Sequence, residues 1–248
     1  MSDAGARAAG SYGLLALGAA VAGFYVVAQL IQQVIVRFML PDAPDVAAEI
    51  ASRLVVSNRV RQAVVMASIF LVPLAYAALA SARWRYAPGA VIAGLMFGLL
   101  FAAFESAYRS IDLFAVGAWA AEFVATTDPI RRDAQLERFM LWDGVVTSLY
   151  LPLLAAHALS CAAFAAAVGS GGRNLDRWDR VLAVALGLNA LRGILRMLQM
   201  HAGVTALGPI NGALYLPVTL LTYGMLSAWL ARAALRVRRS DDRSAAGA

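Results

Sequence analysis

Long runs of apolar residues, separated by short polar or charged segments, follow one another along the chain. An α-helix needs about 20 mostly apolar residues to cross a bilayer. The pattern predicts an all-α, polytopic membrane helix bundle in one domain over residues 1–236. The expected spans are residues 12–36, 61–82, 87–113, 139–168, 179–200 and 210–234.

The first apolar run, residues 12–36, is longer than the core of a cleavable signal peptide, which has about 7–15 residues. We therefore expect it to be a retained span. Residues 113–127 (LFAVGAWAAEFVATT) are apolar but short, and they include Glu122. They either extend the third span or form a helix at the membrane interface.

Two connections between the spans mix charged and apolar residues at helical spacing. Residues 41–60 and 128–138 are therefore expected to form short amphipathic helices on the outer surface, with solvated linkers as the alternative. Residues 237–248 are polar and small, which indicates a disordered cytoplasmic tail.

Composition excludes an ordinary soluble domain. Hydrophobic residues make up 61% of the chain, charged residues only 15%, and the mean hydropathy is +0.69. Soluble domains have about 25% charged residues, and a soluble fold of this size could not bury so much apolar surface. Lipid therefore has to cover it, and membrane lipids are expected partners.

The formal net charge is +6, and every basic residue is an arginine. In a membrane protein this charge indicates orientation rather than nucleic-acid binding. Six spans place both termini and two turns on one side, which we expect to be the cytoplasmic side of a bacterial cytoplasmic membrane. That side carries Arg7, Arg83, Arg85, Arg173, Arg177, Arg180, Arg232, Arg236, Arg238, Arg239 and Arg243.

The residues that commonly bind cofactors are scarce. Cys161 is the single cysteine, so no intrachain disulfide can form, and two histidines are too few for a dedicated metal site. The absence of lysine excludes a retinal-type Schiff base. The sequence therefore predicts no cofactor, no metal and no nucleotide-binding loop.

Charged and amide side chains within the predicted spans are the main site candidates, because charge in hydrocarbon usually faces a bundle interior or a watery cavity. In the third and fifth spans they recur every three or four residues, which places them on one helical face. Most lie in the outer half of the membrane. The primary candidates are Glu105, Arg109, Asp112, Asp143, Asn189, Arg192 and Arg196, and the secondary candidates are Gln29, Gln33, His157, His201 and Tyr215.

Two interpretations of these charges stay open. In the first, the arginines line an outward-facing pocket and bind a carboxylate or a lipid phosphate. In the second, they form a self-neutralising network in which Glu105, Asp112 and Asp143 balance Arg109, Arg192 and Arg196.

The spacing Glu105-x-x-x-Arg109 resembles part of the glutamate–arginine motif of the CAAX-prenyl-protease-like intramembrane proteases. His157 and His201 follow it along the chain. This resemblance implies an intramembrane hydrolase. The chain has Phe104 where that family has a second glutamate, and Thr205 where it has Asn or Asp.

Prolines occur at similar places in three of the predicted spans. Pro73, Pro152 and Pro217 follow Leu-Val, Tyr-Leu and Tyr-Leu in the second, fourth and sixth spans. A proline inside a helix removes a backbone hydrogen bond and bends the helix. The repeat indicates either duplicated helix pairs or chance.

From Val56 the order of features resembles a bacterial family of unknown function, the DUF4386 type. The resembling stretch is VSNRVRQAVVMASIFLVPLAYAALASARWRYAPGAVIAGLMFGLLFAAFESAYRSIDLF. An outer segment with an asparagine precedes the second span, and charged residues fill the distal half of the third. The resemblance implies a six-helix membrane fold and no established activity.

Three hypotheses for function follow. The leading one is a non-enzymatic protein that binds, or binds and transports, a small amphiphile or lipid in an outward-facing polar pocket. The second is a structural or assembly subunit with membrane-protein partners or further copies of itself, since small residues allow close helix approach. Those residues are Gly13, Gly18, Gly23, Gly89, Gly94 and Gly98. The third is the intramembrane hydrolase.

Overall fold

The structure, a computed structural model, describes the backbone of residues 3–171 and 175–246 and the side chains of 11–171 and 175–240. Within these ranges the regular structure is entirely helical, and six helices are long and apolar enough to cross a membrane. This confirms the expected all-α multi-pass bundle. The elements are α1 (Asp3–Phe38), α2 (Val46–Ser52), α3 (Val56–Arg83), α4 (Pro88–Ser110), η1 (Ile111–Val116), α5 (Gly117–Ala125), α6 (Pro129–Gly169), α7 (Arg177–His201), η3 (Thr205–Leu207) and α8 (Gly208–Ala246).

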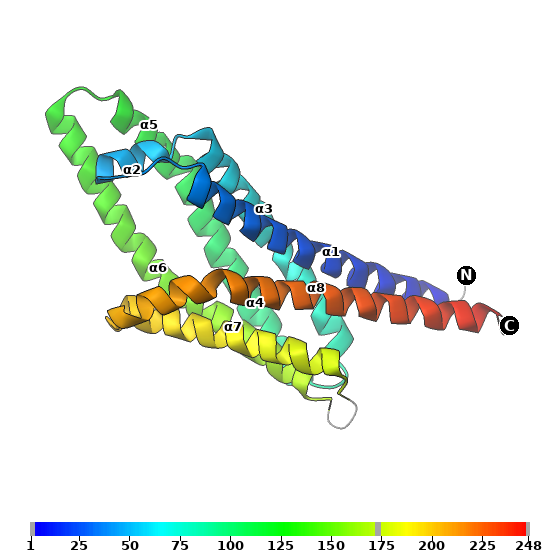
Figure 1. The fold of residues 1–248 in the computed structure, drawn as a ribbon. Coiled ribbons are helices and arrows are strands. Elements are labelled where there is room, and N and C mark those ends of the chain that lie inside the picture. Colours follow the sequence, from blue (N-terminus) through cyan, green and yellow to red (C-terminus); the bar gives the residue numbers. More distant parts are fainter. Residues whose placement is uncertain (1–2, 172–174, 247–248) are drawn as a thin grey trace.

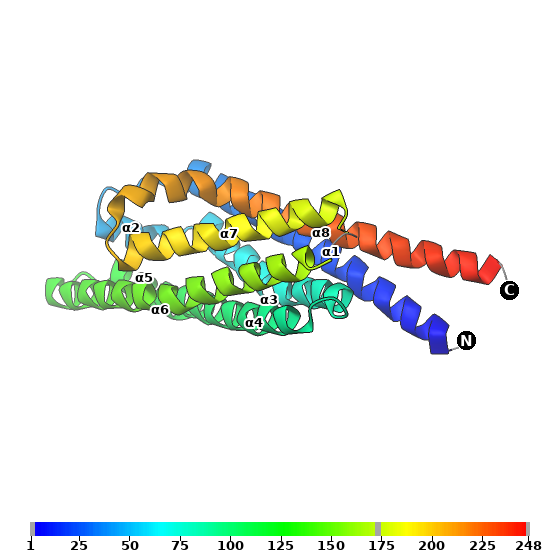
Figure 2. The ribbon, with the colours of Figure 1, turned by 90° about the horizontal axis from the view of Figure 1, so that it is seen from below.

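The long helices form a ring in chain order. Each of α1, α3, α4, α6 and α7 packs against the next one, and α8 closes the ring against α1. Both described ends of the chain lie together at one end of the bundle, which we call the terminal end (Figures 1 and 2). The opposite end carries the short helix α2 and is called the α2 end.

The third span is longer than the sequence suggested. Helix α4 continues without a break through the π-helical η1 into α5, so one helix runs over Pro88–Ala125. Residues 113–127 therefore extend this helix as far as Ala125, which favours the first of the two alternatives for them. Asp112 lies in the π-helical turn of this continuous helix.

The two outer connections differ in structure. In residues 41–60, α2 forms as a separate short helix, and the Asp45 side chain caps it by accepting a hydrogen bond of 2.7 Å from Ala48 N. The prediction of a separate helix at 128–138 is wrong, because these residues are the first turns of α6. Asp128 caps that helix and Pro129 occupies its first turn.

The tail also differs from the prediction. Helix α8 continues to Ala246, so most of residues 237–248 is helical; residues 247–248 lie outside the described range.

The α5–α6 hairpin projects beyond the ring at the α2 end (Figure 1). Helix α6 has 41 residues and a length of about 60 Å, twice the roughly 30 Å of a bilayer core. Edge-to-face contacts join Trp119 to Phe139 and Trp142, and Ile50 of α2 packs on the same cluster. This small second core holds α2 against the hairpin.

Close packing fills the terminal half of the ring. A Cβ atom on Gly98 would lie 2.7 Å from a ring carbon of Tyr76, and one on Gly94 would lie 2.9 Å from the Phe164 ring. Ser160 Oγ donates a hydrogen bond of 2.8 Å to the Gly94 carbonyl. Gly94 and Gly98 therefore allow close contacts between helices of the same chain.

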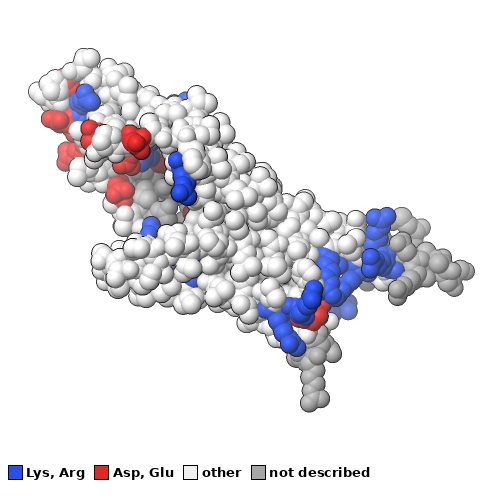
Figure 3. Space-filling view, viewed as in Figure 1, with Lys and Arg blue, Asp and Glu red and all other residues white. Residues whose placement is uncertain are grey.

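Charged side chains gather at the two ends of the molecule, and the face between them is free of charge (Figure 3). At the terminal end Arg83 forms a buried ion pair with Asp179, which also accepts a 2.8 Å hydrogen bond from Trp229 Nε1. Asp176 caps α7 and forms ion pairs with Arg232 and Arg236. These contacts join the last residue of α3, the start of α7 and the C-terminal half of α8.

Candidate functional site

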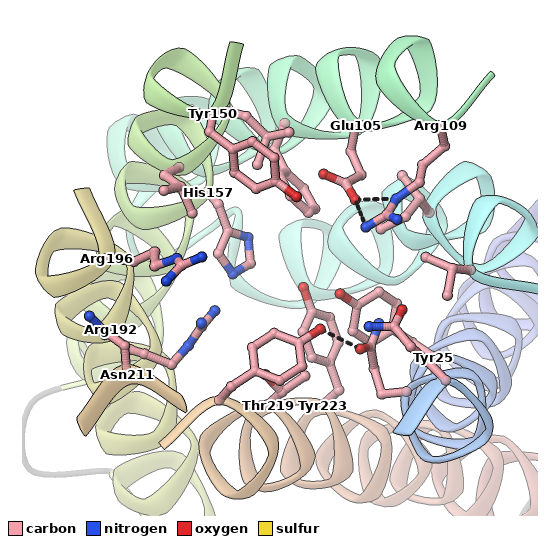
Figure 4. Close-up of a pocket in the computed structure, with 18 of the residues that line it drawn as sticks. Tyr25, Glu105, Arg109, Tyr150, His157, Arg192, Arg196, Asn211, Thr219 and Tyr223 are labelled. Carbon is pink, nitrogen blue, oxygen red and sulfur yellow. Dashed lines mark hydrogen bonds and ion pairs between the residues drawn. The ribbon is translucent and has the colours of Figure 1, made fainter. Parts of the chain in front are cut away.

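A cavity of about 410 Å³ lies inside the ring, in the half nearer the α2 end. All six long helices contribute to its wall, and its volume falls within the range of small-molecule sites, about 300–1,000 Å³. The lining residues are Tyr25, Gln29, Gln32, Gln33, Val65, Ile69, Phe101, Glu105, Arg109, Tyr150, Leu153, Leu154, His157, Arg192, Arg196, Asn211, Gly212, Tyr215, Thr219 and Tyr223. Figure 4 shows most of these side chains.

Helical spacing explains why polar groups converge on the cavity. In α1, α4 and α7, pairs of polar residues four positions apart occupy one face, and that face points into the ring. The pairs are Gln29 with Gln33, Glu105 with Arg109, and Arg192 with Arg196. Of the predicted candidates, these six, together with His157 and Tyr215, line the cavity.

On α4, Arg109 is neutralised by Glu105. Arg109 Nε and Nη2 both lie 2.8 Å from Glu105 Oε1, and Arg109 Nη1 donates to Gln62 Oε1 at 3.2 Å. The Arg109 guanidinium also lies 4.9 Å from the centre of the Tyr108 ring. This wall of the cavity therefore carries no net charge.

Asp112 lies outside the cavity, contrary to the sequence prediction. Its carboxylate accepts hydrogen bonds from Arg53, which reaches it from the α2–α3 connection, and from Gln62 Nε2 at 2.6 Å. It is buried against α3 at the π turn. Arg53 neutralises Asp112 there, and the Gln62 amide links this pair to the Arg109–Glu105 pair of the cavity wall.

Three further candidates also lie elsewhere. Asp143 is exposed, because α6 continues past the ring and carries it two helical turns beyond Tyr150 toward the α2 end. His201 is exposed at the last residue of α7. Asn189 is fully buried behind the cavity wall, where it contacts cavity-lining side chains.

The predicted charge balance therefore does not hold at the cavity. Its lining includes one carboxylate, Glu105, and three guanidinium groups, a net charge of +2. Neither Arg192 nor Arg196 has a carboxylate within ion-pair distance among the described residues. Figure 4 shows both on the side of the cavity opposite the Glu105–Arg109 pair.

The two arginines of α7 are held by neutral partners. Arg192 Nε donates to Asn189 Oδ1 at 3.2 Å, and its guanidinium lies 5.1 Å from the centre of the Tyr215 ring. Arg196 Nη1 donates to Gln199 Oε1 at 2.8 Å, and Asn211 Nδ2 donates to the same oxygen at 3.0 Å. These contacts orient the guanidinium groups without neutralising them.

Tyrosines close the cavity toward the terminal end. The hydroxyls of Tyr76 and Tyr223 are 2.7 Å apart, and the rings of Tyr25 and Tyr223 lie 4.1 Å apart. Near the α1–α8 contact, the Tyr215 hydroxyl donates to Gln29 Oε1 at 2.6 Å. Sequence reasoning missed Tyr25 and Tyr223, which carry no pattern that distinguishes them from core aromatics.

His157 extends from α6 into the cavity (Figure 4). Its Nε2 is 3.1 Å from Asn189 Nδ2, and its ring centre is 4.5 Å from that of Phe101. Glu105 lines the same cavity, but His201 does not, so the protease-like trio is not assembled. Among the described residues, no group of three or more His, Cys, Asp or Glu side chains is placed to hold a metal ion.

Comparison of the chain with protein-family models, with curated proteins and with solved structures finds no match. The resemblance to the DUF4386 type stays a prediction from the sequence.

Proposed function

We propose that this multi-pass membrane protein binds a small amphiphile with an anionic headgroup in the cavity. The observation that carries the proposal is the pair of arginines on α7, Arg192 and Arg196, which line a cavity without a carboxylate partner among the described residues. Uncompensated charge within a membrane is costly and usually marks a site for a ligand or an ion.

The apolar part of the wall accounts for the amphiphilic character of the ligand. Val65, Ile69, Phe101, Leu153 and Leu154 line the same cavity as the arginines. Burial of apolar ligand surface against such a wall contributes about 25 cal/mol of binding free energy for each Å² removed from water. A volume of about 410 Å³ suits a small organic molecule, or the headgroup of a lipid, better than a whole lipid.

The cavity faces away from the cytoplasm in this proposal. Arginines at the terminal end support that orientation through the excess of positive charge that cytoplasmic loops carry. The described ones are Arg83, Arg85, Arg177, Arg180, Arg232, Arg236, Arg238 and Arg239. The ligand then enters from the outer side of a bacterial cytoplasmic membrane, and transport would require the tyrosine cluster at the cavity floor to separate.

Binding is favoured over hydrolysis by the contacts of the candidate catalytic groups. One oxygen of Glu105 accepts hydrogen bonds from two N–H groups of Arg109, and His157 Nε2 forms a hydrogen bond of 3.1 Å with the Asn189 amide. A general base needs a free lone pair within hydrogen-bond reach of the proton it removes. Glu105 keeps its second carboxylate oxygen, but among the described residues no hydrogen bond joins Glu105 to His157, so the two do not form an acid–base pair.

A role as an assembly subunit is the second candidate. The projecting start of α6 supports it, because Ile130, Met140 and Leu141 are 79%, 70% and 66% exposed. Apolar side chains on a projecting hairpin suit contact with another membrane protein or with the lipid interface.

The amphiphile proposal is tested by native mass spectrometry of the protein in lipid nanodiscs, with analysis of every small molecule that co-purifies. We expect a stoichiometric anionic amphiphile that is lost in Arg192→Ala and kept in Arg85→Ala. Arg85 is exposed at the terminal end, so its replacement removes the same charge away from the cavity. A wild-type protein that co-purifies with no small molecule, or that co-purifies with partner subunits, would contradict the proposal.

A further inference from the structure

A chain of hydrogen bonds fixes the protonation of His157. The Arg192 guanidinium can only donate, so the amide oxygen of Asn189 must face it, 3.2 Å away. The amide nitrogen of Asn189 then faces His157 Nε2 at 3.1 Å and donates to it. Since Nε2 accepts this bond, His157 is neutral and carries its ring proton on Nδ1.

The Nδ1 atom of His157 has no hydrogen-bond partner among the described residues. The residue is 5% exposed and belongs to the cavity wall, but Nδ1 itself is buried, so a ligand oxygen reaches Nδ1 only when the side chains around it move apart. A buried donor without an acceptor destabilises a protein by about 1–3 kcal/mol. An acceptor on a bound ligand would remove this cost.

The other free groups beside His157 are donors as well. Arg192 uses its Nε toward Asn189, and Arg196 uses one Nη toward Gln199, so each guanidinium keeps further N–H groups. A group that only accepts hydrogen bonds and carries negative charge satisfies such donors. Carboxylates and phosphates have both properties.

We infer that His157 Nδ1–H, together with the guanidinium groups of Arg192 and Arg196, forms an oxyanion-binding site for a carboxylate or phosphate headgroup. This inference rests on the proposed amphiphile binding and names the class of its ligand. His157 acts there as a neutral donor, oriented by Asn189 and, through it, by Arg192. The apolar wall formed by Phe101 and Leu153 contacts the rest of the ligand.

The histidine tautomer can be measured without any ligand. The chain has two histidines, so ¹⁵N-histidine labelling of the His201→Gln variant leaves one imidazole to observe. We expect the nitrogen spectrum of a neutral ring with its proton on Nδ1. A proton on Nε2, or a charged ring at neutral pH, would overturn the inference whatever the protein binds.

The headgroup class is tested with four eight-carbon probes in nanodiscs: octanoate, octyl phosphate, octanol and octylammonium. We expect the two anions to bind at least tenfold more tightly than the alcohol and the amine. The anion that binds more tightly indicates whether the headgroup of the ligand is a carboxylate or a phosphate. Equal affinities for all four would overturn the oxyanion site and the anionic character of the proposed ligand, but not the binding of an amphiphile in the cavity. No binding of any probe would overturn amphiphile binding as well.

Two substitutions distinguish the roles of the two ring nitrogens of His157. In His157→Asn the amide nitrogen can occupy the place of Nδ1, and in His157→Gln the amide oxygen can take the place of Nε2. We expect the asparagine variant to keep most of the preference for anions and the glutamine variant to lose it. An unchanged preference in the glutamine variant would overturn the role of Nδ1.

Discussion

Arg109 and Glu105 are joined through a single carboxylate oxygen, since Nε and Nη2 of Arg109 both lie 2.8 Å from Oε1 of Glu105. Across the same cavity, Arg192 has no such partner among the described residues. The two walls therefore differ in charge although both carry arginine. In the proposed function, this difference would orient a bound amphiphile with its anionic end toward α7.

Replacing Glu105 by glutamine should destabilise the protein. The change leaves Arg109 charged and nearly buried without its partner, and breaking a buried ion pair costs about 3 kcal/mol. We expect a lower midpoint of thermal unfolding in nanodiscs and tighter binding of octanoate, because the cavity gains positive charge. Glu137→Gln, at an exposed position of α6, is the control and should change neither quantity. A Glu105→Gln variant as stable as the wild type would show that the pair adds nothing to stability.

Replacing Gly98 by alanine should also destabilise the bundle. The added Cβ would lie 2.7 Å from the Tyr76 ring and 3.0 Å from Ser160 Oγ. Overpacking of this kind typically costs about 1–3 kcal/mol. Gly89→Ala is the matched control, because nothing lies within 4 Å of its Cβ and alanine favours a helix over glycine. Thermal unfolding of both variants measures the difference, and equal midpoints would contradict the close approach of α3 and α4.

The tyrosine pair at the cavity floor can be tested by a double-mutant cycle. Tyr76→Phe or Tyr223→Phe leaves one buried hydroxyl without the 2.7 Å contact and should cost about 1–2 kcal/mol. The double variant should cost clearly less than the sum of the two single changes, since it leaves no unpaired hydroxyl. Strictly additive unfolding free energies would show that the two hydroxyls are not coupled.

Acid should weaken the contacts at the terminal end. Desolvation raises the pKa of Asp176, but hydrogen bonds from Asp179 N, Arg236 and Trp178 N and the charge of Arg232 outweigh it, so the pKa is lowered. A carboxyl with a lower pKa in the folded state contributes stability at neutral pH and loses it as the pH falls through that folded value. The stability difference between wild type and Asp176→Asn should therefore shrink below about pH 4. A difference that is constant from pH 7 to pH 3 would contradict this.

The fold could be predicted from the sequence because hydropathy and length fix which segments suit a bilayer. Spacing alone also predicted that Gln29, Glu105 and Arg192 point into the ring, each with a polar residue four positions later on the same helical face. The extent of α6 did not follow, because charged residues near its start suggested a separate surface helix. The structure shows one continuous helix there, and contacts such as Phe139 against Trp119 pack its early turns on α5.

The composition of the site was harder to predict than its location. Asp112 has the spacing of a cavity residue, yet Arg53 binds it from a connection 59 residues away in the sequence. Asp143 has a spacing compatible with Tyr150 on α6, but it lies beyond the ring. In both cases the outcome depends on where other segments lie in space: Arg53 for Asp112, and the end of the helical ring for Asp143. Helical periodicity gives no information on these positions.

The ring order of the helices has a consequence for how the molecule is assembled. Helix α8 is synthesised after the other five long helices, and it alone closes the ring by docking on α1 and α7. Until it inserts, Arg192 lacks the ring of Tyr215, and Gln29 lacks the Tyr215 hydroxyl. The nascent five-helix intermediate thus exposes the polar, cavity-lining faces of α1 and α7 at an open seam, and insertion of α8 completes the wall of the cavity.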